Sequence, residues 1–224
     1  MKKKILIGAV ALAVLAALIV LIVFATGGEK TPEKTIDLEG TWMICSSVDA
    51  GTTTISDTQF AVFTGDQVTL YQDGQQFFTG AWSIDKSQHI QIPGMDRSYA
   101  VNVADPHNVT FYTTDTTFLN LIKVGDTARS FGLADPAELE GTWHIDHRST
   151  DKAVDEVLRF ENGTVSLFRN GEETASATGS YQIDDAGRLH ADLSPSAFDM
   201  LHEGDILYLT DRDTGYVWVL SPVA

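Results

Sequence analysis

The feature that most constrains the fold of this chain is an internal repeat with a period of about 100 residues. Leu38–Trp42 reads Leu-Glu-Gly-Thr-Trp and recurs as Leu139–Trp143. The similarity continues downstream at a nearly constant offset, from Phe63–Val68 to Phe160–Val165. A unit of this length is too long for a solenoid repeat and has enough apolar residues for a core of its own. The pattern therefore predicts a tandem duplication.

Each copy is expected to form one domain, at residues 38–124 and 139–224. Residues 125–138 form the linker between them. Within it, Asp135-Pro136-Ala137-Glu138 combines an N-cap residue, a proline at the first helical position and an acidic residue two positions later. This combination predicts one short helical turn just before the second domain.

Apolar residues in both copies alternate with polar ones, as half-buried strands require. Turn residues such as Asp73-Gly74 and Asn162-Gly163 separate the runs and favour type I′ hairpins, which join antiparallel neighbours. In the second copy, Ser194–Ala197 could instead start a helical turn before residues 198–201. The runs of the first copy predict strands at residues 41–48, 58–63, 67–73, 76–85, 88–93, 98–104, 108–114 and 117–124. A meander of hairpins removes its exposed edges by closing on itself. We therefore expect an all-β protein with two small eight-stranded antiparallel up-and-down barrels.

The two Gly-Thr-Trp motifs carry a resemblance to a known family. Gly40 and Trp42, and again Gly141 and Trp143, resemble the start of the first strand in small bacterial lipocalin-like (calycin-type) domains. The resemblance covers residues 38–224 and implies a barrel in which Trp42 or Trp143 plugs one end, with the glycine allowing close packing. It also implies a basic residue of the last strand against the tryptophan. Lys123 matches in the first copy, whereas Ser221 stands in that region of the second.

The short copies limit the space inside each barrel. At about 7 residues per strand, with half facing inward, about 28 side chains fill each interior. Large aromatic residues are expected to take much of that volume, so a large ligand cavity is not expected. They are Phe63, Trp82, Phe111 and Phe118 in the first copy, and Phe160, Tyr181, Tyr208 and Trp218 in the second.

The N-terminal residues have the pattern of a membrane anchor. Lys2–Lys4 precede an uncharged apolar run at residues 5–25, which is long enough to cross a bilayer as a helix. The basic cluster places residues 1–4 in the cytoplasm and the chain beyond a linker at residues 26–37 outside the cell membrane. The alternative is a signal peptide cleaved after Ala25, which would release a secreted protein.

Composition excludes two classes of protein. The chain has 15 Lys plus Arg against 31 Asp plus Glu, a formal charge of -16, which would repel the phosphate backbone of a nucleic acid. Its one cysteine, Cys45, cannot form an intramolecular disulfide, so the chain is not a small protein stabilised by disulfide bonds.

Candidate metal and catalytic residues do not form a recognisable site. His144 and Asp146 should share the outward face of a strand, with His147 facing inward beside Trp143 and Ile145. Asp211–Gly215 is expected to be a turn rather than a calcium loop, since it lacks the later ligand positions. No metal site, cofactor or catalytic residue is predicted.

Three functions fit this reading of the sequence. The first is a non-catalytic surface module that binds a protein, an envelope polymer or a peptide through the loops at the open barrel ends. The second is a carrier or sensor of a small apolar ligand inside a barrel. The third, an enzyme, lacks a motif that supports it. An internal void of a few hundred Å3, the lower end of usual ligand pockets, would favour the second.

Overall fold

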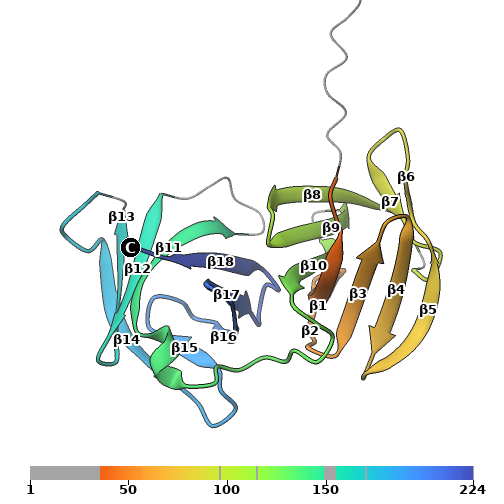
Figure 1. Ribbon diagram of the computed structural model, residues 1–224. Helices are drawn as coiled ribbons and strands as arrows, with labels where there is room; N and C mark the ends of the chain where they lie inside the picture. Colours follow the sequence, from red (N-terminus) through yellow and green to blue (C-terminus); the bar gives the residue numbers. More distant parts are fainter. Residues whose placement is uncertain (1–35, 96, 115, 149–154, 170, 224) are drawn as a thin grey trace, which may run out of the picture. The chain divides into compact units, whose positions relative to one another are not determined.

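The computed structural model describes residues 36–223, apart from residues 96, 115, 149–154 and 170. Leu38–Ala224 forms one compact unit. The described chain is almost entirely β-structure, and its strands form two antiparallel sheets, one from each copy of the repeat (Figure 1). The predicted all-β class and the tandem arrangement of barrel-like sheets are confirmed.

The first sheet has ten strands. Their order across the sheet is β5-β4-β3-β1-β10-β9-β8-β7-β6, and β2 pairs with β1 outside this path. The strands are β1 (Gly40–Asp49), β2 (Thr52–Ile55), β3 (Gln59–Thr64), β4 (Gln67–Gln72), β5 (Gln75–Ala81), β6 (Ser83–Ile84), β7 (His89–Gln91), β8 (Tyr99–Asp105), β9 (Asn108–Thr114) and β10 (Thr117–Val124).

The second sheet is a closed barrel in which each strand pairs with the next in sequence and β18 returns to β11. Its sixth strand is regular, so residues 198–201 do not follow a helical turn. The strands are β11 (Gly141–Arg148), β12 (Glu156–Glu161), β13 (Thr164–Arg169), β14 (Ala177–Ile183), β15 (Leu189–Ala191), β16 (Ala197–Glu203), β17 (Ile206–Asp211) and β18 (Val217–Pro222).

One strand decides whether each sheet closes. β14 is continuous: its first half pairs with β13 and its second half with β15, which completes the barrel. The corresponding stretch of the first copy is split at Trp82 into β5, which pairs with β4, and β6, which pairs with β7. The first sheet is therefore a barrel of the same topology that is nearly closed.

The turns and the connector follow their local chemistry. At Asp73-Gly74 and Asn162-Gly163 both residues have positive φ, as a type I′ turn requires. Between the sheets, Pro136–Leu139 forms the predicted helical turn, a 3-10 helix named η1. The Asp135 side chain accepts a hydrogen bond from the Ala137 N–H at 2.9 Å, and Glu138 accepts one from the Asp135 N–H at 3.0 Å.

Apolar side chains are buried inside each sheet, and a further core lies between the two sheets. This further core joins Met43, Cys45 and Ile122 of the first sheet to Tyr208 and Val219 of the second. These side chains lie on the outer faces of their sheets. β1 and β17 are consequently buried on both faces rather than alternating between core and solvent.

Two aromatic residues expected inside the barrels lie outside them. Phe118 is on the outer face of β10 and stacks on Tyr216 of the second copy, with ring centroids 5.4 Å apart. Tyr208 belongs to the core between the sheets, where its hydroxyl donates to the Lys123 carbonyl at 3.1 Å. The expectation assumed that every large aromatic faces a barrel interior, but these two are covered by the other sheet.

A β-bulge at the same place in both copies changes which side chains face inward. The pairing register shifts between Ile44 and Ser46 in β1 and between Ile145 and His147 in β11. After the shift His147 lies opposite Val219, whose side chain is in the core between the sheets. His147 is therefore buried, but on the outer face, and its predicted inward direction was wrong.

The predicted membrane helix at residues 5–25 lies outside the described residues. Within residues 36–223, apart from the gaps, no helix has the length and apolar character needed to span a bilayer.

Candidate functional site

The second barrel contains a cavity of about 250 Å3. Most of the described residues that line it are apolar and belong to the barrel core. They include Leu158, Phe160, Leu189, Phe198, Leu209 and Trp218. Its volume is close to the few hundred Å3 expected of a small-ligand carrier, although the cavity is partly open rather than enclosed.

Two large-to-small differences between the copies affect the interior of this barrel. Phe78 pairs with Leu70 in the first sheet, and at the corresponding place Ala177 pairs with Leu167. The Phe78 ring packs so tightly over Gly80 that a Cβ added there would lie 2.6 Å from it. The second barrel has a methyl group where the first has this ring.

The second difference is at Ile92, which is 3% exposed and corresponds to Ala191. The two residues start equivalent turns: Met95 N–H donates to the Ile92 carbonyl at 2.9 Å, and Ser194 N–H to the Ala191 carbonyl at 3.0 Å. Ala191 lines the cavity. Both changes remove side-chain volume, whereas Leu193, which lines the cavity, stands in the place of Gly94 of the first copy and adds volume.

A charged pair lies at the wall of this apolar cavity. Beyond the bulge in β11, Arg148 pairs with Trp218 and faces inward. Its guanidinium carbon lies 4.1 Å from the centroid of the Trp218 ring, and its Nη2 donates to Glu156 Oε2 at 2.7 Å. Cation–π and ion-pair contacts therefore hold the Arg148 side chain in place.

The Nε of Arg148 is buried, and no described residue offers it a hydrogen-bond acceptor. Sequence reasoning missed Arg148 and Glu156 because strict alternation would place Arg148 on the outer face. The bulge that reverses its direction leaves no obvious mark in the sequence. A comparison of the copies for lost volume, at Phe78 and Ala177, would have drawn attention to this barrel.

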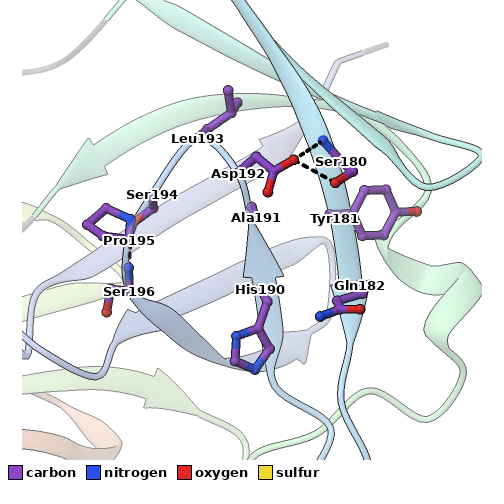
Figure 2. Close-up of a pocket in the computed structure, with 10 residues that line it drawn as sticks. All are labelled: Ser180, Tyr181, Gln182, His190, Ala191, Asp192, Leu193, Ser194, Pro195 and Ser196. Carbon is purple, nitrogen blue, oxygen red and sulfur yellow. Dashed lines mark hydrogen bonds between the residues drawn. The ribbon is translucent and has the colours of Figure 1, made fainter.

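An open groove of about 760 Å3 lies on the outside of the same barrel, along β14, β15 and the loop that follows (Figure 2). Within the groove, Asp192 of the loop is hydrogen-bonded to Ser180 of β14. Its Oδ2 accepts from the Ser180 N–H at 3.0 Å and from the Ser180 hydroxyl at 2.6 Å. These bonds hold the pKa of Asp192 below its ordinary value. Ala191, Leu193 and Ser194 line both the groove and the cavity, so the two adjoin at this loop.

The signature residues of the repeat occupy matching positions. Trp42 Nε1 donates to the Leu38 carbonyl at 2.7 Å, and Trp143 Nε1 to the Leu139 carbonyl at 2.9 Å. Lys123 Nζ lies 5.5 Å from the centroid of the Trp42 ring, as the resemblance implies. Among the described residues, no Lys or Arg side chain lies over the Trp143 ring, which meets the His202 ring in a T-shaped contact.

Gly40 and Gly141 precede these tryptophans with φ of 117° and 135°. Such angles favour glycine because other residues rarely adopt them. A Cβ on Gly40 would lie 3.2 Å from Lys123 Cε, whereas the nearest atom to one on Gly141 is 3.9 Å away. Backbone conformation, more than close packing, is what both positions share.

The other candidate residues have structural partners. His144 Nδ1 lies 2.8 Å from Asp146 Oδ1 on the outer face, as predicted. Asp211 accepts from the N–H groups of Asp213 and Thr214, both at 2.9 Å, which makes Asp211–Gly215 a turn. Among the described residues, no three His, Cys, Asp or Glu side chains come together as metal ligands would.

No protein-family model and no curated protein matches the chain. Among solved structures, it is similar over 81% of its length to a putative DNA polymerase III beta subunit from Eubacterium rectale, with 8% sequence identity and a TM-score of 0.16. The similarity spans 57% of that chain. A TM-score this low supports no statement about fold or function.

Proposed function

We propose that the second barrel binds a small, mainly apolar molecule, and that the protein carries or senses this molecule. The observation behind the proposal is the 250 Å3 cavity lined by core side chains of the barrel. Ligand sites are usually apolar hollows with a few polar groups that orient the ligand, and Arg148 with Glu156 provides such groups here.

The size of the cavity limits the ligand. At about 30 Å3 for each water-sized group, the space holds about eight such groups. Burying eight carbon groups at ~0.8 kcal/mol each contributes ~6 kcal/mol. This corresponds to a dissociation constant between about 1 mM and 1 µM. The proposed ligand is therefore a compact molecule, smaller than a fatty acid chain or a steroid.

The setting of the site belongs to the same proposal. Residues 38–124 and 139–224 are two lipocalin-like domains without catalytic activity, held outside the cell by a membrane anchor at residues 5–25. The repeat with its Gly-Thr-Trp motifs and the hydropathy of the N-terminus support this arrangement. A site outside the membrane would meet small molecules before they reach the cell.

The test fills the cavity with the residue that the first copy already accommodates. Saturation-transfer NMR on the full chain, with toluene as probe, should detect binding to the wild type. Ala191→Ile should abolish it, because the larger side chain projects into the cavity. The matched control is Ile92→Val at the corresponding place in the first sheet, which should leave binding unchanged. Equal toluene binding by wild type and Ala191→Ile would count against a site in this cavity.

A further inference from the structure

The open groove on the outside of the second barrel presents polar atoms that its own side chains leave unused. Asp192 Oδ2 accepts both hydrogen bonds from Ser180, and no described residue donates to Oδ1. Gln182 is exposed and pairs with His190 across β14 and β15, and its side-chain amide has no partner among the described residues. These three side chains lie in the groove (Figure 2) and are open to a ligand.

Two of these side chains are fixed from one side only. His190 Nε2 lies 3.0 Å from Asp184 Oδ2, which also accepts from Arg188 Nε at 2.8 Å. The other ring nitrogen, Nδ1, makes no hydrogen bond within the described part of the chain. Asp192 is held in the same way by the N–H and hydroxyl of Ser180. Groups that are already positioned lose little conformational entropy when a ligand binds.

The lining of the groove determines which charge a ligand can carry. Asp192 is the only acidic residue among the described residues that line it, and none of them is Lys or Arg. The hydrogen bonds from Ser180 keep the pKa of Asp192 below its ordinary value, so the carboxylate is ionised at neutral pH. This charge, and the formal charge of -16 on the chain, repel an anionic ligand. An ammonium group instead forms a charge-assisted hydrogen bond with Asp192.

The size and polarity of the groove indicate what else the ligand carries. Its 760 Å3 lies within the range of ligand sites. At about 30 Å3 for each water-sized group it holds about 25 groups, the size of a disaccharide. The Asp192 N–H donates to the Ser180 carbonyl at 2.9 Å and so continues the pairing of β15, which places Asp192 about 7 Å along the chain from His190. Polar groups spread over this length suit hydroxyl groups, which both donate and accept, better than a lysine side chain, which is polar only at its end.

The first sheet has the same local frame without these groups. When the copies are aligned through the β6–β7 and β14–β15 pairs, Ala81 and Pro93 stand where the second copy has Ser180 and Asp192. The strands therefore form without the carboxylate and its serine partner. The polar groove belongs to the second copy, and the fold alone does not require it.

We propose that this groove binds a short saccharide that carries an ammonium group, with the ammonium on Asp192 Oδ1 and hydroxyl groups on Gln182 and His190. The ring of Pro195 offers apolar surface to the C–H groups of the sugar. The site lies outside the barrel and takes a polar ligand, so this inference does not rest on the proposed function.

Two β-1,4-linked disaccharides with the same number of non-hydrogen atoms separate charge from shape: diglucosamine and cellobiose. Dissociation constants are measured by NMR titration on the full chain at about pH 6, where amino groups are protonated. The amide signals of Gln182 and Asp192 report binding in the groove. Diglucosamine should bind about three- to tenfold more tightly than cellobiose, because one hydrogen bond becomes charge-assisted. Added NaCl at about 0.5 M should reduce this preference, since exposed charges are screened.

Two variants test the residues involved. Asp192→Asn keeps an acceptor oxygen but removes the charge, so the preference for diglucosamine should disappear while cellobiose still binds. Gln182→Ala should weaken both disaccharides by about threefold, the effect of one lost hydrogen bond. The matched control is Ser83→Ala, at the corresponding position of the first sheet, which should leave both affinities unchanged. Circular dichroism matching the wild type shows that each variant is folded.

Several outcomes would overturn the inference. Equal affinities of the wild type for the two disaccharides contradict the role of Asp192, as does a diglucosamine preference that persists in Asp192→Asn. If neither disaccharide shifts the groove signals, the groove is not a saccharide site. If tetralysine shifts them at lower concentration than diglucosamine does, the ligand is a basic peptide. Gln182 does not line the cavity, so toluene binding should be unchanged in Gln182→Ala, and the two proposals stand or fall separately.

Discussion

Cys45 and Asp146 stand at the same bulge position of the two copies and have opposite surroundings. Cys45 is fully buried in the core between the sheets, and its Sγ–H donates to the Asn120 carbonyl at 3.2 Å. Asp146 is partly exposed and accepts from the Ser221 hydroxyl at 3.0 Å. Whether the other sheet covers the position decides which side chain can occupy it. Burial raises the pKa of the Cys45 thiol to about 12.

We expect Cys45 to resist alkylation in the native protein. Iodoacetamide at about pH 9, where a thiol with the ordinary pKa of 9.0 is half ionised, should leave Cys45 unmodified. The reasons are that the raised pKa keeps the thiol protonated and that the second sheet blocks access. Addition of guanidinium should allow complete modification, measured by mass spectrometry. Rapid labelling of the folded chain would mean that the sheets do not pack over β1 as described.

At the scale of strands and turns, much of the fold could be predicted from local patterns. Alternating residues identified most strands of the first copy, although the predicted strand at residues 76–85 is split into β5 and β6. Asn162-Gly163 correctly predicted the hairpin between β12 and β13, since few dipeptides allow positive φ at both positions. The capping residues Asp135 and Glu138 likewise located η1.

The missed features depend on contacts that local patterns do not record. Strand β2 has three threonines and no apolar alternation, and it forms where Thr53 donates to the Asp213 carbonyl of the second copy at 2.8 Å. The bulge in β11 reverses the directions of His147 and Arg148. The candidate site was missed for that reason, because strict alternation would place its one basic residue, Arg148, on the outer face.

The hairpin between β14 and β15 gives a prediction about pH. Asp184 accepts from the ring of His190 at 3.0 Å and from the Arg188 N–H, also at 3.0 Å. The hydrogen bond from His190 is the main reason that the pKa of Asp184 lies well below its ordinary value. A carboxylate with a lowered pKa in the folded state stabilises the fold above the unfolded pKa of about 3.9 and loses this effect as pH falls.

Asp184→Asn should therefore lower the urea midpoint of unfolding at neutral pH. The difference from the wild type should stay constant down to about pH 4 and shrink as the pH falls further, because the unfolded carboxylate and then the folded one become protonated. Urea titrations at a series of pH values measure this. A difference that grows in acid would contradict the assigned direction of the shift.

At the scale of the whole compact unit, the core between the sheets makes the two copies dependent on each other. Asn120 Nδ2 donates to the Gly215 carbonyl at 2.7 Å, and Met43, Ile122 and Val219 are all buried at 6% exposure or less. Separating the sheets would expose this apolar surface to water, which is unfavourable. The repeat predicted two domains, but nothing in either copy alone indicated the core that they share.

We expect the two sheets to unfold together. Urea unfolding followed by tryptophan fluorescence should give one transition, because neither sheet keeps its buried outer face without the other. Val219→Asp places a charge in the shared core and should split the transition or lower the free energy of unfolding by about 2 kcal/mol or more. Gln182→Asp, at an exposed position of β14, is the control and should behave as the wild type does. Two transitions in the unmodified chain would show that the copies are energetically independent.

Phe78 and Ile92 of the first copy are replaced by Ala177 and Ala191 in the second, whose barrel contains the cavity of about 250 Å3. Hydrostatic pressure favours states from which internal voids have been removed. Compression should therefore shift the NMR amide signals of the second barrel at lower pressure than those of the first sheet. The first sheet would then serve as an internal control for the effect of the cavity in the second barrel.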